Sequence, residues 1–246
     1  MRFREFGPNE GKAVVLLHGG GLNWWNFREA ARALAGTYHV VLPILDGHAG
    51  SDRPFTSIED NAREILSWMD GRLGGRAALL GGLSLGAQVA VEMLHQRPDL
   101  CDAALVESAA LIPDRLTHAL VGPAFGSSYG LIRRRWFSKL QFRSLHMDLA
   151  LFEDYYRDTC TIEKRDMIAF VQASAAYALP DLSGVTARVA VYVGEKENGR
   201  MQRSARLLKD ALPGAALHVL PGLYHGEFSL NQGAEYARAA RTLLEN

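Results

Sequence analysis

Ser84 stands between two glycines, in the sequence G-L-S-L-G of residues 82–86. The apolar run of residues 77–80 before it predicts a buried strand, and residues 87–94 after it predict a helix. A serine at such a strand-to-helix turn needs small neighbours, because the turn forces its backbone into an unusual conformation. The start of the helix also offers N–H groups to a developing anion. The pattern therefore favours a nucleophilic serine, and a plain glycine-rich turn is the alternative.

The base that would activate Ser84 is expected in a loop late in the chain. A serine hydroxyl is a poor nucleophile until a base removes its proton. His225 follows the predicted strand of residues 216–220. Of the eight histidines, it alone combines a loop after a strand with a late position. A lone loop histidine is often an ordinary surface residue, but the turn at Ser84 makes the base the favoured interpretation.

An acidic side chain commonly orients such a histidine, and it is expected between the serine and the histidine in the chain. Glu195 and Glu197 both follow the predicted strand of residues 189–193. Glu197 is the favoured acid and Glu195 the second candidate. Glu107, after the predicted strand of residues 101–106, is a weaker third. The sequence leaves the choice between Glu197 and Glu195 open.

Acyl transfer also needs backbone N–H groups that face the oxyanion of the tetrahedral intermediate. The amide of Leu85, at the helix start, is one candidate donor. A second comes from the glycines at positions 19–21, where missing side chains let the backbone approach a substrate. Gly20 is the favoured donor and Gly21 the alternative, while a plain flexible turn is the non-catalytic interpretation. We expect His18 to brace this loop through local hydrogen bonds.

Residues beside the glycine loop are expected to contact the substrate. Gly19 and Gly21 allow close approach of the backbone, and Trp24 is a candidate wall of an acyl or alcohol pocket. Packing beneath the first helix is an equally good interpretation of Trp24. The sequence contains no cluster with metal-ligand spacing and no nucleotide-binding glycine pattern, so neither a metal nor a cofactor is expected.

The elements that position these residues alternate along the chain. Strands are predicted from apolar runs at residues 13–17, 38–42, 77–80, 101–106, 189–193 and 216–220. Helical patterns between them predict an α/β fold, in which a mostly parallel sheet is covered by helices on both faces. Ligands bind at the carboxyl ends of such strands, and every candidate above follows a strand.

Residues 113–180 interrupt this alternation. They are rich in aromatic residues and predict several helices with no strand. We expect them to form a helical lid over the site, and the alternative is that they cover a face of the sheet. The chain would then comprise an α/β core, residues 1–112 and 181–246, and a lid, residues 113–180.

These motifs together resemble the α/β-hydrolase-fold superfamily, over nearly the whole chain outside the lid. The resemblance rests on residues 18–21, 82–86 and 194–197 and on His225. It implies a carboxylesterase-like serine hydrolase that cleaves a small to medium ester, thioester or lactone through an acyl-enzyme. It gives Ser84 the role of nucleophile and His225 that of base and acid, with Leu85 and Gly20 as oxyanion donors.

The chain departs from the family pattern at two places. Glu197 stands where the family commonly has aspartate, and the longer side chain changes the reach to the histidine. The loop of residues 43–51 also differs, which puts Asp46 and His48 in doubt as site residues. Because the fold hosts many chemistries, a C–C bond hydrolase and a hydroxynitrile-lyase-like enzyme are alternatives. A non-catalytic protein that binds a small ligand is the alternative from another class.

Composition sets limits on the partners. Twenty-seven basic and 27 acidic residues cancel, so no overall field recruits nucleic acid or an anionic membrane. The tight basic run of residues 133–135 is interpreted as a solvated helix face. Two cysteines are too few for a disulfide scaffold, and no apolar stretch approaches the length of a membrane span. We expect a cytoplasmic protein that acts on a small molecule, and the oligomeric state does not follow from the sequence.

Overall fold

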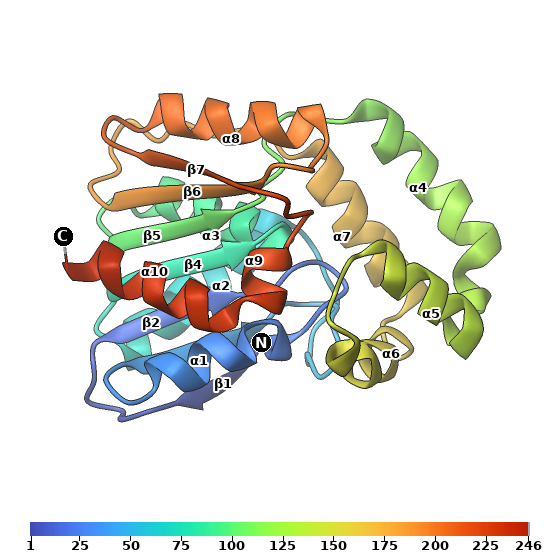
Figure 1. The fold of residues 1–246 in the computed structure, drawn as a ribbon, viewed down its shortest axis with the longest axis horizontal. Coiled ribbons are helices and arrows are strands. Elements are labelled where there is room, and N and C mark those ends of the chain that lie inside the picture. Colours follow the sequence, from blue (N-terminus) through green and yellow to red (C-terminus); the bar gives the residue numbers. More distant parts are fainter. Residues whose placement is uncertain (246) are drawn as a thin grey trace.

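The computed structural model describes residues 1–245, which fold around one seven-stranded sheet (Figure 1). The strand order is β1-β3-β2-β4-β5-β6-β7. Strands β2 to β7 are parallel, and β1 pairs antiparallel with β3 at one edge. The strands are β1 Arg2–Phe6, β2 Ala13–Leu17, β3 His39–Ile44, β4 Ala77–Leu83, β5 Cys101–Glu107, β6 Arg188–Gly194 and β7 Ala216–Leu220. The predicted α/β fold with a mostly parallel sheet is confirmed.

Helices cover both faces of this sheet. On β2, Val15 and Leu17 pack in one hydrophobic layer, while Val14 and Leu16 pack in a second layer. Successive side chains of a strand point to opposite faces, so the two layers lie on opposite sides of the sheet. The first layer is closed by α2 Ile58–Arg72, α3 Leu85–Gln96 and α8 Gly199–Ala211, and the second by α1 Arg28–Leu34 and α10 Gly233–Glu245.

Four helices lie between β5 and β6 and form what we call the helical insertion, residues 113–180. They are α4 Arg115–Ser128, α5 Arg135–Ser144, α6 Phe152–Thr159 and α7 Lys164–Ala176, with short 3-10 turns between them. Figure 1 shows the insertion beyond one end of the strands, and α4 and α5 lie farthest from the sheet. This end is the one at which β4 passes into α3. The insertion therefore stands at the end of the sheet where parallel strands present ligand-binding residues.

Strand β1 was not expected from the sequence. Its sequence contains the charged residues Arg2, Arg4 and Glu5, which are not typical of a buried strand. It is an edge strand, and Phe3 stacks on Trp68 of α2 with ring centroids 4.1 Å apart. One well-packed aromatic residue and pairing with a buried strand are enough to hold it. Among the described residues, none of the helices combines the length and the apolar character that a membrane span requires.

Candidate active site

Ser84 lies at the junction of β4 and α3 in a strained conformation. Its φ is 53° and its ψ is −113°, a region that residues with a Cβ rarely adopt. The flanking glycines are required by close approach: a Cβ on Gly82 would lie 2.5 Å from the Gly86 carbonyl oxygen. A Cβ on Gly86 would lie 2.5 Å from the His18 carbonyl oxygen and closer still to that of Leu17. The pattern of small residues around Ser84 therefore follows from backbone packing of α3 against β2.

Glu197 forms a hydrogen bond with His225. The Glu197 Oε2 atom lies 2.7 Å from His225 Nδ1, and its Oε1 atom accepts from Ser108 Oγ at 2.6 Å and from the Gly194 amide at 2.8 Å. The Glu197 side chain is 2% exposed, whereas that of His225 is 42% exposed. The carboxylate is thus fixed by three partners beneath a histidine that solvent or substrate can reach. A carboxylate at Nδ1 favours the tautomer in which Nε2 is free to accept a proton.

The His225 loop packs directly on the serine turn. Gly226, the next residue, has φ 77°, and a Cβ there would lie 3.1 Å from the side chain of Leu83. Leu83 immediately precedes Ser84 in the chain. The structure therefore brings together the ends of β4, β6 and β7, which carry Ser84, Glu197 and His225.

The electrostatics of this pair favour a charged carboxylate and a basic imidazole. Burial acts to lower the pKa of His225, but the hydrogen bond and charge of Glu197, with the charge of Glu107, outweigh it and raise the pKa above its ordinary value. Burial likewise acts to raise the pKa of Glu197, but His225, Ser108 and the Gly194 amide outweigh it and lower the pKa. The imidazole is consequently a stronger base than a free histidine.

The two other acid candidates have different partners. Glu195 Oε2 accepts from the Gly222 amide at 2.8 Å, so this side chain holds the turn after β7. Glu107 is buried, and its Oε1 atom accepts from the Ser229 amide at 3.3 Å. Burial raises the pKa of Glu107 to about 7. Of these three glutamates, Glu197 alone forms a hydrogen bond with His225 in the part of the chain that the structure describes.

The glycine loop leaves one amide available. The Gly19 amide donates to Asn26 Oδ1 at 3.1 Å, and the Gly21 amide donates to His48 Nε2 at 3.0 Å. The Gly20 amide has no hydrogen-bond partner in the part of the chain that the structure describes. A Cβ on Gly20 would lie 3.5 Å from the Leu85 side chain, so the two expected oxyanion donors are neighbours. This arrangement favours Gly20 over Gly21 as the second donor.

Two buried histidines brace this loop. His18 Nδ1 donates to the Gly19 carbonyl oxygen at 2.9 Å, and its Nε2 accepts from the Leu45 amide at 3.1 Å. His48 Nδ1 donates to the Asp46 carbonyl oxygen at 3.0 Å. Burial lowers the pKa of His18 to about 3 and that of His48 to about 4. Both rings are therefore neutral near pH 7 and serve as fixed hydrogen-bond partners.

The Trp24 side chain packs on residues of the edge strand β1 and of α1. Its ring contacts Phe6, with centroids 6.0 Å apart, and the guanidinium groups of Arg4 and Arg28 lie over it. Trp25 is buried, and its Nε1 donates to Asp158 Oδ2 at 2.8 Å. The packing interpretation of Trp24 fits these contacts, so we do not include Trp24 in the site.

Two residues of the site, Ser108 and Asn26, were missed in the sequence, and a third, His48, was left in doubt. Ser108 directly follows β5 and has φ 55°, so its place after a predicted strand was a usable signal. Asn26 and His48 accept hydrogen bonds from amides of the glycine loop, and no spacing in the sequence points to these two hydrogen bonds. The described residues include no group of three or more His, Cys, Asp or Glu that could hold a metal ion.

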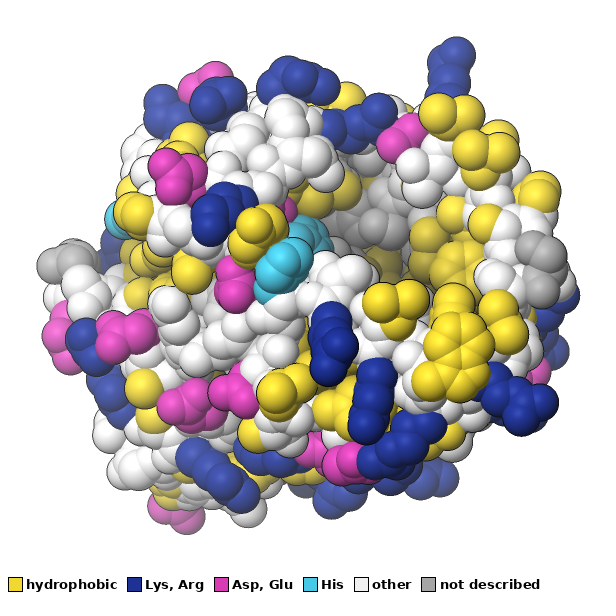
Figure 2. All heavy atoms as spheres, turned by 45° about the vertical axis from the view of Figure 1, so that its right-hand side comes forward, with side chains coloured by type: hydrophobic (Ala, Val, Ile, Leu, Met, Phe, Trp, Pro, Cys, Tyr) yellow, Lys and Arg dark blue, Asp and Glu magenta, His cyan; other side chains and the backbone are white. Residues whose placement is uncertain are grey.

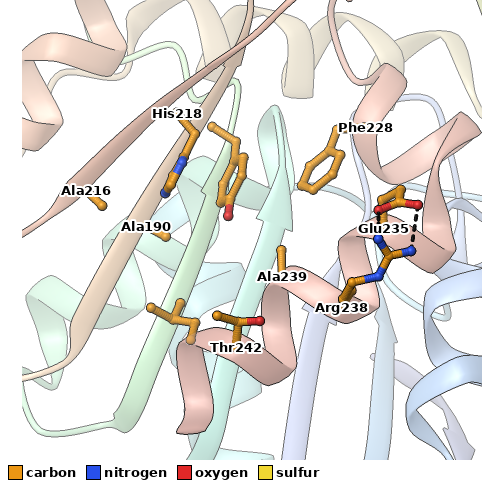
Figure 3. Close-up of a pocket in the computed structure, with 10 residues that line it drawn as sticks. Ala190, Ala216, His218, Phe228, Glu235, Arg238, Ala239 and Thr242 are labelled. Carbon is orange, nitrogen blue, oxygen red and sulfur yellow. Dashed lines mark hydrogen bonds and ion pairs between the residues drawn. The ribbon is translucent and has the colours of Figure 1, made fainter. Parts of the chain in front are cut away.

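Two hollows differ in their relation to these residues. Figure 2 shows histidine side chains beside a hollow in the face that carries the insertion. A second hollow of about 510 Å³ lies between β6, β7 and α10, and Figure 3 shows His218, Phe228 and the Glu235–Arg238 ion pair around it. None of Ser84, Glu197 and His225 lines this second hollow, so it is separate from the site.

Several known proteins are similar to this chain over most of its length. Lipase 1 of Psychrobacter immobilis is 23% identical over all of this chain and 81% of its own length. Pimeloyl-[acyl-carrier protein] methyl ester esterase of Neisseria meningitidis is 27% identical over all of this chain and 98% of its own length. A thermophilic esterase from Thermogutta terrifontis superposes with a TM-score of 0.80 at 17% identity, over 99% of this chain and 92% of the esterase. Residues 14–239 match the family described as alpha/beta hydrolase family, and the chain therefore belongs to that family.

Proposed function

We propose that this chain is a serine hydrolase that cleaves a small to medium carboxylic ester through an acyl-enzyme intermediate. The observation that carries the proposal is the hydrogen bond of 2.7 Å between His225 Nδ1 and buried Glu197, beside the strained turn at Ser84. Names of the similar proteins, a lipase and a methyl ester esterase, support ester chemistry.

The reaction follows from the roles of these groups. His225 Nε2 takes the proton of the Ser84 hydroxyl as Oγ attacks the ester carbonyl carbon. The amides of Gly20 and Leu85 donate to the resulting oxyanion, and each such donor contributes about 3 kcal/mol to transition-state stabilisation. His225 then gives its proton to the leaving alcohol as the C–O bond breaks. Water attacks the acyl-enzyme by the same sequence and releases the acid and Ser84.

The helical insertion would act as the lid of this site. Phe170 of α7 stacks on His48 with ring centroids 4.5 Å apart, and a Cβ on Gly20 would lie 3.5 Å from the Phe170 ring. An aromatic residue of the insertion thus lies beside the expected oxyanion donor. This contact suits an apolar acyl group next to the reacting carbonyl.

A fluorophosphonate probe and p-nitrophenyl esters of increasing acyl length test the proposal. The parent protein should be labelled at Ser84 and should hydrolyse the short esters. Ser84→Ala should abolish labelling and lower kcat by several orders of magnitude. Ser183→Ala, which changes an exposed serine outside the site, should leave both unchanged. Absence of labelling in the parent would favour the non-catalytic ligand-binding protein, and full activity of Ser84→Ala would reject the mechanism.

A further inference from the structure

Exposed hydrophobic side chains are concentrated on the helical insertion. Nine large hydrophobic residues are exposed among the described residues, and seven of them lie between positions 116 and 149. These seven are Leu116, Leu120, Leu131, Trp136, Leu140, Leu145 and Leu149. Scattered surface leucines need no explanation, but a concentration of this kind on one segment marks an interaction site.

The same segment carries a strong positive charge that the balanced composition conceals. Residues 115–147 contain six arginines and lysines and no aspartate or glutamate. Arg135 pairs with Glu153 of α6. The other five have no ion pair within residues 1–245: Arg115, Arg133, Arg134, Lys139 and Arg143. Their charges are therefore available to an external anionic partner.

Helix α5 carries both the apolar and the basic side chains on its exposed side. Ser138 and Phe142 are buried against the rest of the insertion, while Trp136 and Leu140, four residues apart, are 64% and 63% exposed. Arg143 lies one turn farther on, on the exposed side. On α4, Leu116 and Leu120 repeat the same spacing. Figure 2 shows hydrophobic side chains grouped on this part of the surface, with Lys and Arg side chains beside them.

We propose that the exposed face of α4 and α5 docks on a lipid bilayer that contains anionic lipids. Tryptophan and leucine on one side of a helix, with arginine and lysine beside them, are the residue types of helices that lie in a membrane interface. Long basic side chains can reach phosphate groups while their stems cover apolar surface. An acidic protein would have to bury four exposed large apolar side chains at i, i+4 spacing as well as satisfy the charges, and binding to such a protein is a separate outcome of the test.

Docking of this face would place the end of the sheet that carries Ser84 near the lipid surface (Figure 1). The proposal does not depend on ester hydrolysis, because binding to vesicles is measured without turnover. Ser84→Ala should therefore bind vesicles as the parent does, and failure of the proposed chemistry would leave this proposal standing.

Co-sedimentation with vesicles provides the test. The parent should bind vesicles of phosphatidylcholine mixed with phosphatidylglycerol at least about ten-fold more tightly than vesicles of phosphatidylcholine alone. Raising the salt from about 0.1 M to about 1 M should weaken binding, because the screening length falls from about 10 Å to about 3 Å. Trp136 is strongly exposed, whereas Trp25 is buried and Trp24 and Trp68 are half-buried. Its emission should therefore shift to the blue on binding.

Two pairs of substitutions separate the apolar and the charged contributions. Trp136→Ser with Leu140→Ser, and Arg134→Glu with Arg143→Glu, should each weaken vesicle binding about ten-fold or more. Leu207→Ser with Arg206→Glu, on the exposed side of α8, is the matched control and should bind as the parent does. Failure of the parent to bind mixed vesicles, or equal binding by the insertion variants, would overturn the proposal. Retention of the parent on an acidic protein without vesicle binding would identify the other class of partner.

Discussion

The end of the sheet and the helical insertion differ in whether their charged and apolar side chains have partners within the protein. At the sheet, Glu197 is 2% exposed and has three hydrogen-bond partners. In residues 115–147, five basic side chains lack ion pairs among the described residues, and large apolar side chains face solvent. The first region is arranged for fixed geometry, and the second is arranged for contact. The difference predicts that substitutions at the end of the sheet change catalysis and folding, whereas substitutions of exposed residues of α4 and α5 leave both nearly unaltered.

The largest expected effect is at Glu197. Glu197→Gln should lower kcat about 10³- to 10⁴-fold, because the amide cannot stabilise the imidazolium that forms during the reaction. Glu195→Gln should change kcat by less than about three-fold, since that side chain holds the Gly222 turn. Steady-state kinetics on the best p-nitrophenyl ester measures both. Equal losses in the two variants would remove Glu197 from the proposed triad.

The pH dependence of activity tests the same contact between Glu197 and His225. His225 acts as a base only when neutral, and its raised pKa means that activity should fall as the pH drops through a value above about 6.5. In Glu197→Gln, the charge and the charged hydrogen-bond partner are gone, and burial then lowers the pKa of His225 below that value. NMR titration of the imidazole in both proteins measures the shift. An upward shift in the variant would contradict the assigned causes.

A large effect on stability is expected at Gly86. Gly86→Ala would force a Cβ against the backbone carbonyl groups of Leu17 and His18, which cannot rotate away. Urea denaturation should show a loss of about 3 kcal/mol or more in the free energy of unfolding. A loss below about 1 kcal/mol would mean that α3 packs less closely on β2 than described.

A smaller effect on catalysis is expected at His48. His48→Ala removes the acceptor of the Gly21 amide and frees the glycine loop, so kcat should fall about ten-fold with little change in KM. His48→Gln, whose amide oxygen can accept the same hydrogen bond, should recover part of the loss. Unchanged kcat in the alanine variant would show that the loop keeps its shape without His48.

The smallest effect is expected within α4. A Cβ on Gly126 would meet nothing within 4 Å among the described residues, and Gly126 lies inside the helix. Gly126→Ala should therefore raise the free energy of unfolding by about 0.5–1 kcal/mol, because alanine has the higher helix propensity. Thermal denaturation measures the gain, and a destabilised variant would mean that α4 is more closely packed than its exposure indicates.

The sheet was predictable from the sequence because its strands are continuous apolar runs, and buried parallel strands have that pattern. The choice between Glu195 and Glu197 was not predictable, because both residues follow the same strand. The turn after β6 directs the Glu197 side chain toward His225 and the Glu195 side chain toward Gly222. The bond between Gly21 and His48 joins residues 27 positions apart through two loops, and no local pattern encodes it. The apolar face of α5 was hidden for a different reason, since exposure depends on which side the neighbouring helices leave open.

Asp158 limits how far α6 of the insertion can move from the core. This α6 carboxylate accepts from Trp25 Nε1 at 2.8 Å and from Asn23 Nδ2 at 3.0 Å, two donors just after the glycine loop. Withdrawing α6 would leave buried donors without an acceptor, at a cost of about 1–3 kcal/mol each. The α6 end is therefore an anchor of the insertion on the α/β core. Hydrogen exchange should reflect this anchor, with slower exchange in α6 than in the more exposed helix α4.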